Sequence, residues 1–117
     1  MPRVTHFEIF AEDPQRATEF YHNVFGWRVE KWNGPLDYWQ LTTGSGEPGI
    51  NGAIAKRERP EERVVNTIDV PDLDAYLKVV NQHGGRTVVE KVAIPGVGWM
   101  AYCEDPEGNR FGLLQGD

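Results

Sequence analysis

The feature that most constrains the fold of this chain is an internal repeat, in which corresponding residues stand 59 positions apart. Self-similarity at a fixed offset is typical of chains built from copies of one structural unit. Few identical residues remain, but helix caps and an apolar helical stripe coincide at this offset, which favours a true duplication. The corresponding pairs are Ile9 and Ile68, Asp13 and Asp72, Phe20 and Val79, and Gly26 and Gly85.

The first copy opens with an alternating, β-rich segment at residues 4–10, which predicts a strand. Asp13 is a favourable N-cap and Pro14 a favourable first helical residue, so we expect a helix to begin there. Gly26 stands where a left-handed residue would end this helix. The helical spacing of apolar residues predicts one buried stripe, made of Ala17, Phe20, Tyr21 and Val24. Further strands are expected at residues 28–32, 37–43 and 49–56.

The second copy repeats this order. Residues 64–70 are expected to form a strand, Pro71 and Asp72 to open a helix, and Gly84 with Gly85 to close it. The remaining strands are expected at residues 87–93, 98–104 and 110–114.

These elements predict an α+β fold of two βαβββ modules in tandem, with module 1 at about residues 4–56 and module 2 at about residues 63–115. The length of 117 residues suits a single domain spanning residues 1–117. In that domain the modules should form a curved, cleft-bearing mixed sheet with the helices outside. A ferredoxin-like fold is disfavoured because its order is βαββαβ.

The alternation of side chains along a strand predicts which residues face the cleft. Phe7 and Ile9 should pack on the first helix, and the residues between and beside them should point inward. The expected inward residues are His6, Glu8 and Phe10 in the first copy and Val65, Thr67 and Asp69 in the second.

The composition excludes several classes of function. The net charge of −6 argues against a nucleic-acid partner, because neutralising phosphates requires a basic face. No apolar run reaches the roughly 18 to 20 residues that span a bilayer, and no signal-peptide pattern is present. We therefore expect a cytoplasmic protein without a membrane partner. The single cysteine, Cys103, excludes an internal disulfide and a zinc cage made of cysteines.

Three segments and the duplicated module resemble the glyoxalase/bleomycin resistance/extradiol dioxygenase superfamily, also called vicinal oxygen chelate (VOC) proteins. The segments are VTHFEIFAEDPQRATEFYHNVFGW at the start, NTIDVPDLDAYLKVVNQHGG in the middle and DPEGNRFGLLQ near the end. The Asp105–Phe111 stretch is the most specific match. Its proline pre-sets a turn and its glycine permits a positive φ before the last strand. The small bacterial glyoxalase-related proteins are especially similar.

The resemblance implies where a metal would bind. Metal-using members hold a divalent ion with four inward residues, usually His and Glu, on the first, fourth, fifth and eighth strands. A lone imidazole cannot hold a catalytic metal against water, so we expect a protein without this site and without a cofactor. The matching positions here are His6, then Asn51 or Gly52, then Val65 beside Asn66, and finally Gly112.

The leading hypothesis is a protein that binds a small organic ligand in the cleft, as a sequestering or sensing protein or as a metal-free enzyme. His6 could then serve as a polar contact or as an acid or base, because imidazole titrates near neutrality. Aromatic side chains could stack on a flat or apolar ligand. The candidate ligand-binding residues are His6, Glu8, Trp39, Asn51, Trp99 and Tyr102.

The alternative is a divalent-metal-dependent lyase, isomerase or dioxygenase of the same superfamily, which uses a rearranged ligand set such as His6, Glu8 and Asn51. Under either hypothesis we expect a homodimer, because the superfamily members that this chain resembles are commonly dimers assembled by module pairing. The modules could pair within one chain or exchange between chains. The segments GINGAIA and VNTIDV should act as edge strands whose unpaired backbone groups favour pairing across a two-fold axis.

Overall fold

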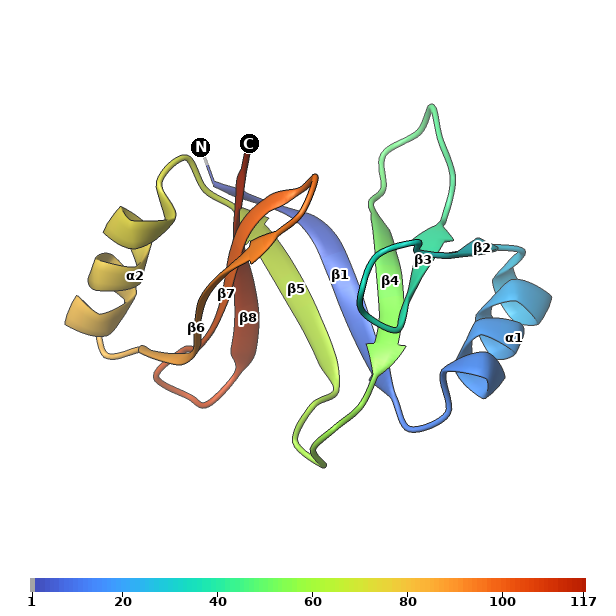
Figure 1. Cartoon of the computed structure of the whole chain (residues 1–117), viewed down its shortest axis with the longest axis horizontal. Helices are drawn as coiled ribbons and strands as arrows, with labels where there is room; N and C mark the ends of the chain where they lie inside the picture. Colours follow the sequence, from blue (N-terminus) through green and yellow to red (C-terminus); the bar gives the residue numbers. More distant parts are fainter. Residues whose placement is uncertain (1) are drawn as a thin grey trace. The chain divides into compact units, whose positions relative to one another are not determined.

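The computed structural model describes residues 2–117, and over these residues the chain forms two helices and eight strands (Figure 1). These divide into two compact units. The N-terminal unit is His6–Val64, and the C-terminal unit is Val65–Asp117 together with residues 2–5. The expected α+β class and the repeated βαβββ order are confirmed.

The N-terminal unit holds a mixed four-stranded sheet in the order β2-β3-β4-β1. Strand β4 runs parallel to β1 and antiparallel to β3, so it is an interior strand. The expectation that the GINGAIA segment forms an edge is therefore wrong. The elements are β1 (Arg3–Ala11), α1 (Pro14–Phe25), β2 (Arg28–Lys31), β3 (Tyr38–Thr42) and β4 (Asn51–Lys56).

Helix α1 begins and ends where its capping residues predict. The Asp13 carboxylate accepts a hydrogen bond from the backbone N–H of Arg16 at 3.1 Å, which satisfies one of the free N–H groups of the first turn. Gly26 adopts a φ of 73° and donates its N–H to the His22 carbonyl at 2.8 Å. A residue with a side chain would be strained at that φ.

The predicted buried stripe of α1 is only partly correct. Ala17 and Tyr21 pack against the sheet and Thr18 is buried, but Phe20 and Val24 are exposed. Successive helical residues are rotated by about 100°, so a sheet-facing stripe centred on residues 17, 18 and 21 leaves Phe20 on the flank. The spacing of apolar residues correctly predicted which side of α1 faces the sheet, but it predicted more buried residues on that side than the structure has.

The strands of the C-terminal unit are ordered β5-β8-β7-β6, and β5 runs parallel to β8. Asp72 caps its helix as expected, with the Ala75 N–H donating to the carboxylate. The positive φ falls on Gly84 rather than Gly85, because this helix is shorter than α1 and the repeat slips by one residue. The elements are β5 (Val64–Asp69), α2 (Leu73–Gln82), β6 (Arg86–Ile94), β7 (Gly98–Glu104) and β8 (Arg110–Gly116).

Each unit builds its own core between its helix and one face of its sheet. In the N-terminal unit, buried Ala11, Leu41 and Ile54 form the centre of this core. Phe7 and Ile9 pack against it, which confirms the predicted alternation along β1. In the C-terminal unit the buried centre is Val70, Leu73, Ala101, Cys103 and Leu113. The opposite face of the N-terminal strands carries His6 and Glu8, which alternate along β1 with Phe7 and Ile9.

Neither α1 nor α2, the helices of the described residues, is long and apolar enough to span a membrane.

Candidate functional site

The side chains of His6, Tyr38 and Glu8 form a polar network on the face of the N-terminal sheet that points away from α1. The Nε2 atom of His6 lies 2.9 Å from the hydroxyl oxygen of Tyr38. The same hydroxyl is hydrogen-bonded to the Glu8 carboxyl group, which is only 3% exposed. A buried carboxylate needs such a donor, because an unpaired charge is costly away from water.

The network fixes the protonation of its members near neutral pH. Burial, followed by the charge of Glu8, raises the pKa of the Tyr38 hydroxyl, so this group remains a proton donor. Burial lowers the pKa of His6, so its imidazole is neutral. When Tyr38 donates to an ionised Glu8, its oxygen accepts the Nε2–H of His6. The Nδ1 lone pair of His6 then has no partner among residues 2–117 and can accept a proton or a hydrogen bond.

Tyr38 is the member of this network that was not among the candidate ligand-binding residues. It is the first residue of β3, pairs with Ala55 of β4, and contacts the Trp32 ring edge-on with centroids 5.9 Å apart. Strand alternation was the signal in the sequence that could have identified Tyr38. Tyr38 and Trp39 are adjacent in the strand, so only one of them can lie on the same face of the sheet as His6.

Trp39 takes the opposite face. It pairs with Ile54 and packs with the core between the sheet and α1, where the Lys31 ammonium lies 5.3 Å from its ring centroid. Trp39 therefore does not join His6 and Glu8, and its contacts are those of a core residue.

The fourth-strand position is settled by the register of β1 and β4. Asn51 pairs with His6, whereas Gly52 pairs with Phe7, whose ring leaves no room for a side chain at that position. Asn51 is thus the residue on the face of His6. Its side-chain oxygen is already engaged, because it accepts hydrogen bonds from the backbone N–H and the hydroxyl of Thr43 at 2.8 and 3.2 Å.

The candidates of the C-terminal unit also separate by face. Trp99 is exposed and has the same orientation as buried Ala101, with Lys91 over its ring at 4.8 Å. Tyr102 lies on the other face, beside Gly112. The Thr67 hydroxyl is close to the same glycine, is 1% exposed, and has no hydrogen-bond partner among the described residues.

The residues present do not fit the four-ligand metal site of the superfamily. Val65 and Gly112 offer no side-chain ligand, and the Asn51 oxygen is used by Thr43. Over residues 2–117, no three His, Cys, Asp or Glu side chains gather closely enough to hold a metal ion. No chemical step is therefore assigned to a metal.

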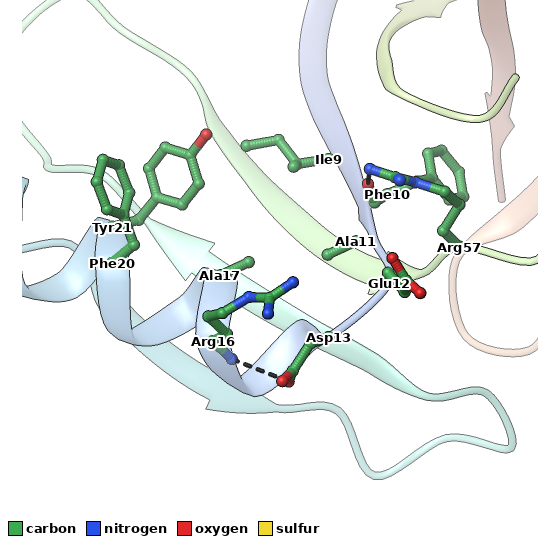
Figure 2. A pocket seen from close by; sticks show the side chains of 10 residues that line it. All are labelled: Ile9, Phe10, Ala11, Glu12, Asp13, Arg16, Ala17, Phe20, Tyr21 and Arg57. Carbon is green, nitrogen blue, oxygen red and sulfur yellow. Dashed lines mark hydrogen bonds between the residues drawn. The ribbon is translucent and has the colours of Figure 1, made fainter. Parts of the chain in front are cut away.

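A separate pocket lies in the N-terminal unit between α1 and the end of β1 (Figure 2). Its volume is about 450 Å³. Arg16 reaches into it from α1, and Arg57 enters from the segment after β4 (Figure 2). This pocket shares no lining residue with the His6 network, and sequence reasoning did not identify it.

Comparisons with known proteins agree with this architecture. The model of the Glyoxalase/Bleomycin resistance protein/Dioxygenase superfamily matches residues 3–113. A Glyoxylase-like domain-containing protein from Didymella fabae is 29% identical over 95% of this chain and 91% of its own length.

Solved structures resemble the fold at low sequence identity. A superfamily member from Vibrio splendidus 12B01 is 20% identical, covers the whole of both chains and has a TM-score of 0.69. A methylmalonyl-CoA epimerase in complex with methylmalonyl-CoA and NH4+ is 17% identical, covers 99% of this chain and 95% of its own, and has a TM-score of 0.71.

Proposed function

This chain belongs to the glyoxalase/bleomycin resistance protein/dioxygenase superfamily, and we infer that it binds a small organic ligand against His6, Tyr38 and Glu8 without a catalytic metal. The observation that carries this proposal is the contact of 2.9 Å between His6 Nε2 and the Tyr38 hydroxyl, which is backed by buried Glu8. Such a network orients the imidazole and leaves Nδ1 as an acceptor on the strand face that also carries Asn51.

The ligand class follows from that acceptor. Neutral His6 accepts from an O–H or N–H group, or from an acidic C–H next to a carbonyl. The network can also relay a proton, because each member can both give and take one along the line from His6 through Tyr38 to Glu8. Proton transfer is accordingly the reaction that these residues support if the ligand is a substrate.

The test is a screen of small carbonyl compounds and phenols by amide chemical shifts of the isotope-labelled protein. Binders should shift the amides of β1 and β3, and His6→Ala should weaken their affinity at least tenfold. His83→Ala is the matched control, since His83 is exposed at the end of α2. Unchanged affinity in His6→Ala would refute this assignment.

The metal-dependent alternative is tested separately. Chelator-treated protein is titrated with nickel, zinc, iron(II) and manganese(II) while the melting temperature is followed. We expect no stoichiometric tight binding and no rise in melting temperature. Tight binding that is lost in His6→Ala would instead support a metal enzyme with a rearranged ligand set.

A further inference from the structure

The pocket between α1 and the end of β1 contains two arginines that lack acidic partners. Neither Arg16 nor Arg57 forms an ion pair within the described part of the chain. Charged side chains that line a pocket without counterions attract a ligand of opposite charge, and the arginine fork matches a carboxylate or phosphate.

Arg57 is held in place but retains unused donors. Its backbone N–H bonds to the Ala11 carbonyl at 2.8 Å, and its Nη2 donates to the Phe10 carbonyl at 3.2 Å. Its Nε–H is shielded from solvent and has no hydrogen-bond partner among residues 2–117. A buried donor without a partner marks a site where an acceptor is missing.

The acidic residues of the pocket do not neutralise these arginines. The Asp13 carboxylate is engaged as the N-cap of α1, where it accepts from the Arg16 backbone. The backbone carbonyl of Glu12 accepts a hydrogen bond from the ammonium of Lys56, which is not a lining residue. The lining therefore carries two basic side chains, Arg16 and Arg57, and two acidic ones, Glu12 and Asp13, and among the described residues neither acidic side chain forms an ion pair with either arginine.

The opposite wall of the pocket is apolar and partly aromatic. Phe20 is 54% exposed, and its ring stands edge-on to Tyr21 with centroids 5.2 Å apart. Ile9 and Ala17 continue this wall (Figure 2). An exposed phenylalanine gains stability when a ligand removes it from water.

We propose that this pocket binds an organic carboxylate with an apolar tail, with the carboxylate on Arg16 and Arg57 and the tail on Phe20 and Tyr21. Inorganic phosphate fits less well, because it leaves the apolar wall uncovered and because Asp13 already caps the helix N-terminus. The site lies apart from His6, Tyr38 and Glu8 and does not depend on the function proposed for them.

The probe is phenylacetate, with phenylacetamide as its neutral counterpart. Titrations followed by amide chemical shifts should show saturable changes around Asp13–Tyr21 and Arg57, with a Kd of about 1 to 10 mM, as expected for about ten non-hydrogen atoms. Phenylacetamide should bind at least tenfold more weakly. Added salt should weaken binding of the carboxylate, because it screens the arginines.

Arg16→Gln and Arg57→Gln should each weaken phenylacetate binding about tenfold, whereas Arg28→Gln, which removes an exposed arginine of β2 outside the pocket, should leave it unchanged. If Arg57→Gln fails to fold, Arg57→Lys provides the test, because it keeps the charge but loses the fork. The proposal is overturned if phenylacetamide binds equally well, if phosphate displaces the probe at equal concentration, if the changes map to His6, or if no saturable binding occurs.

Discussion

The hydroxyl of Tyr38 joins two side chains that would otherwise be separate, the neutral imidazole of His6 and the buried carboxyl group of Glu8. Each of these three side chains is held by a hydrogen bond to a neighbour in the network. Glu8 needs a donor because it is shielded from water, and Tyr38 needs an acceptor for its proton. His6 is oriented by the tyrosine oxygen, so its free Nδ1 points in a defined direction.

Tyr38→Phe should therefore destabilise the protein although it removes only one oxygen atom. Buried Glu8 loses the hydrogen bond from Tyr38, and we expect the free energy of unfolding to fall by about 1–3 kcal/mol. Urea unfolding at pH 7 measures the change. Tyr76→Phe is the control, because the Tyr76 hydroxyl makes no hydrogen bond within the described residues, and its effect should be small. Equal effects of the two substitutions would contradict the network.

His6 should make stability depend on pH in a defined window. Burial lowers its pKa in the folded protein below the ordinary value of 6.5, so the unfolded chain binds the proton more readily. The contribution of neutral His6 is therefore complete above pH 6.5 and is lost as the pH falls through the folded pKa. Urea unfolding at pH 7.5 and pH 5.5 should show a smaller loss of stability in His6→Gln than in the native protein. The control variant His83→Gln should lose as much stability between pH 7.5 and pH 5.5 as the native protein does.

The elements themselves followed from local rules. Asp13, Pro14 and Gly26 marked α1 to the residue, and alternation placed Phe7 and Ile9 on the helix side. These predictions succeeded because caps and alternation are decided by neighbours in sequence. The sequence could not show on which face of the sheet Trp39 and Asn51 lie. An error of one residue in a strand boundary or in the pairing register moves a side chain to the other face.

Gly52→Ala tests the register that separates Asn51 from Gly52. A methyl group at position 52 would lie 2.5 Å from the Phe7 ring, so the ring must move within the core. We expect a loss of about 1–3 kcal/mol in the free energy of unfolding, as for other overpacked cores. Gly49→Ala is the control, because nothing lies near the added methyl group and the backbone there is unstrained. Equal stability of both variants would show that β1 and β4 pair differently.

The two units share one plan but divide the chemistry unequally. The N-terminal unit holds both the His6 network and the arginine-lined pocket, which share no lining residue. The C-terminal unit offers Tyr102 and the Thr67 hydroxyl, which has no hydrogen-bond partner within residues 2–117. Duplication therefore preserved the core positions, which both units need, while the residues on the other face diverged.

We expect the protein to be a homodimer, although β4 does not provide the edge strand that the sequence indicated. The support that remains is exposed apolar side chains outside the arginine-lined pocket, including Val24 and Phe25 on α1 and Val64 at the start of β5. Exposed apolar surface is stabilised when a second chain covers it, at about 25 cal/mol per Å². Light scattering at micromolar concentration should give about twice the 13.3 kDa of one chain. A mass of one chain that does not change with concentration would show that the protein is a monomer, and that water alone covers these side chains.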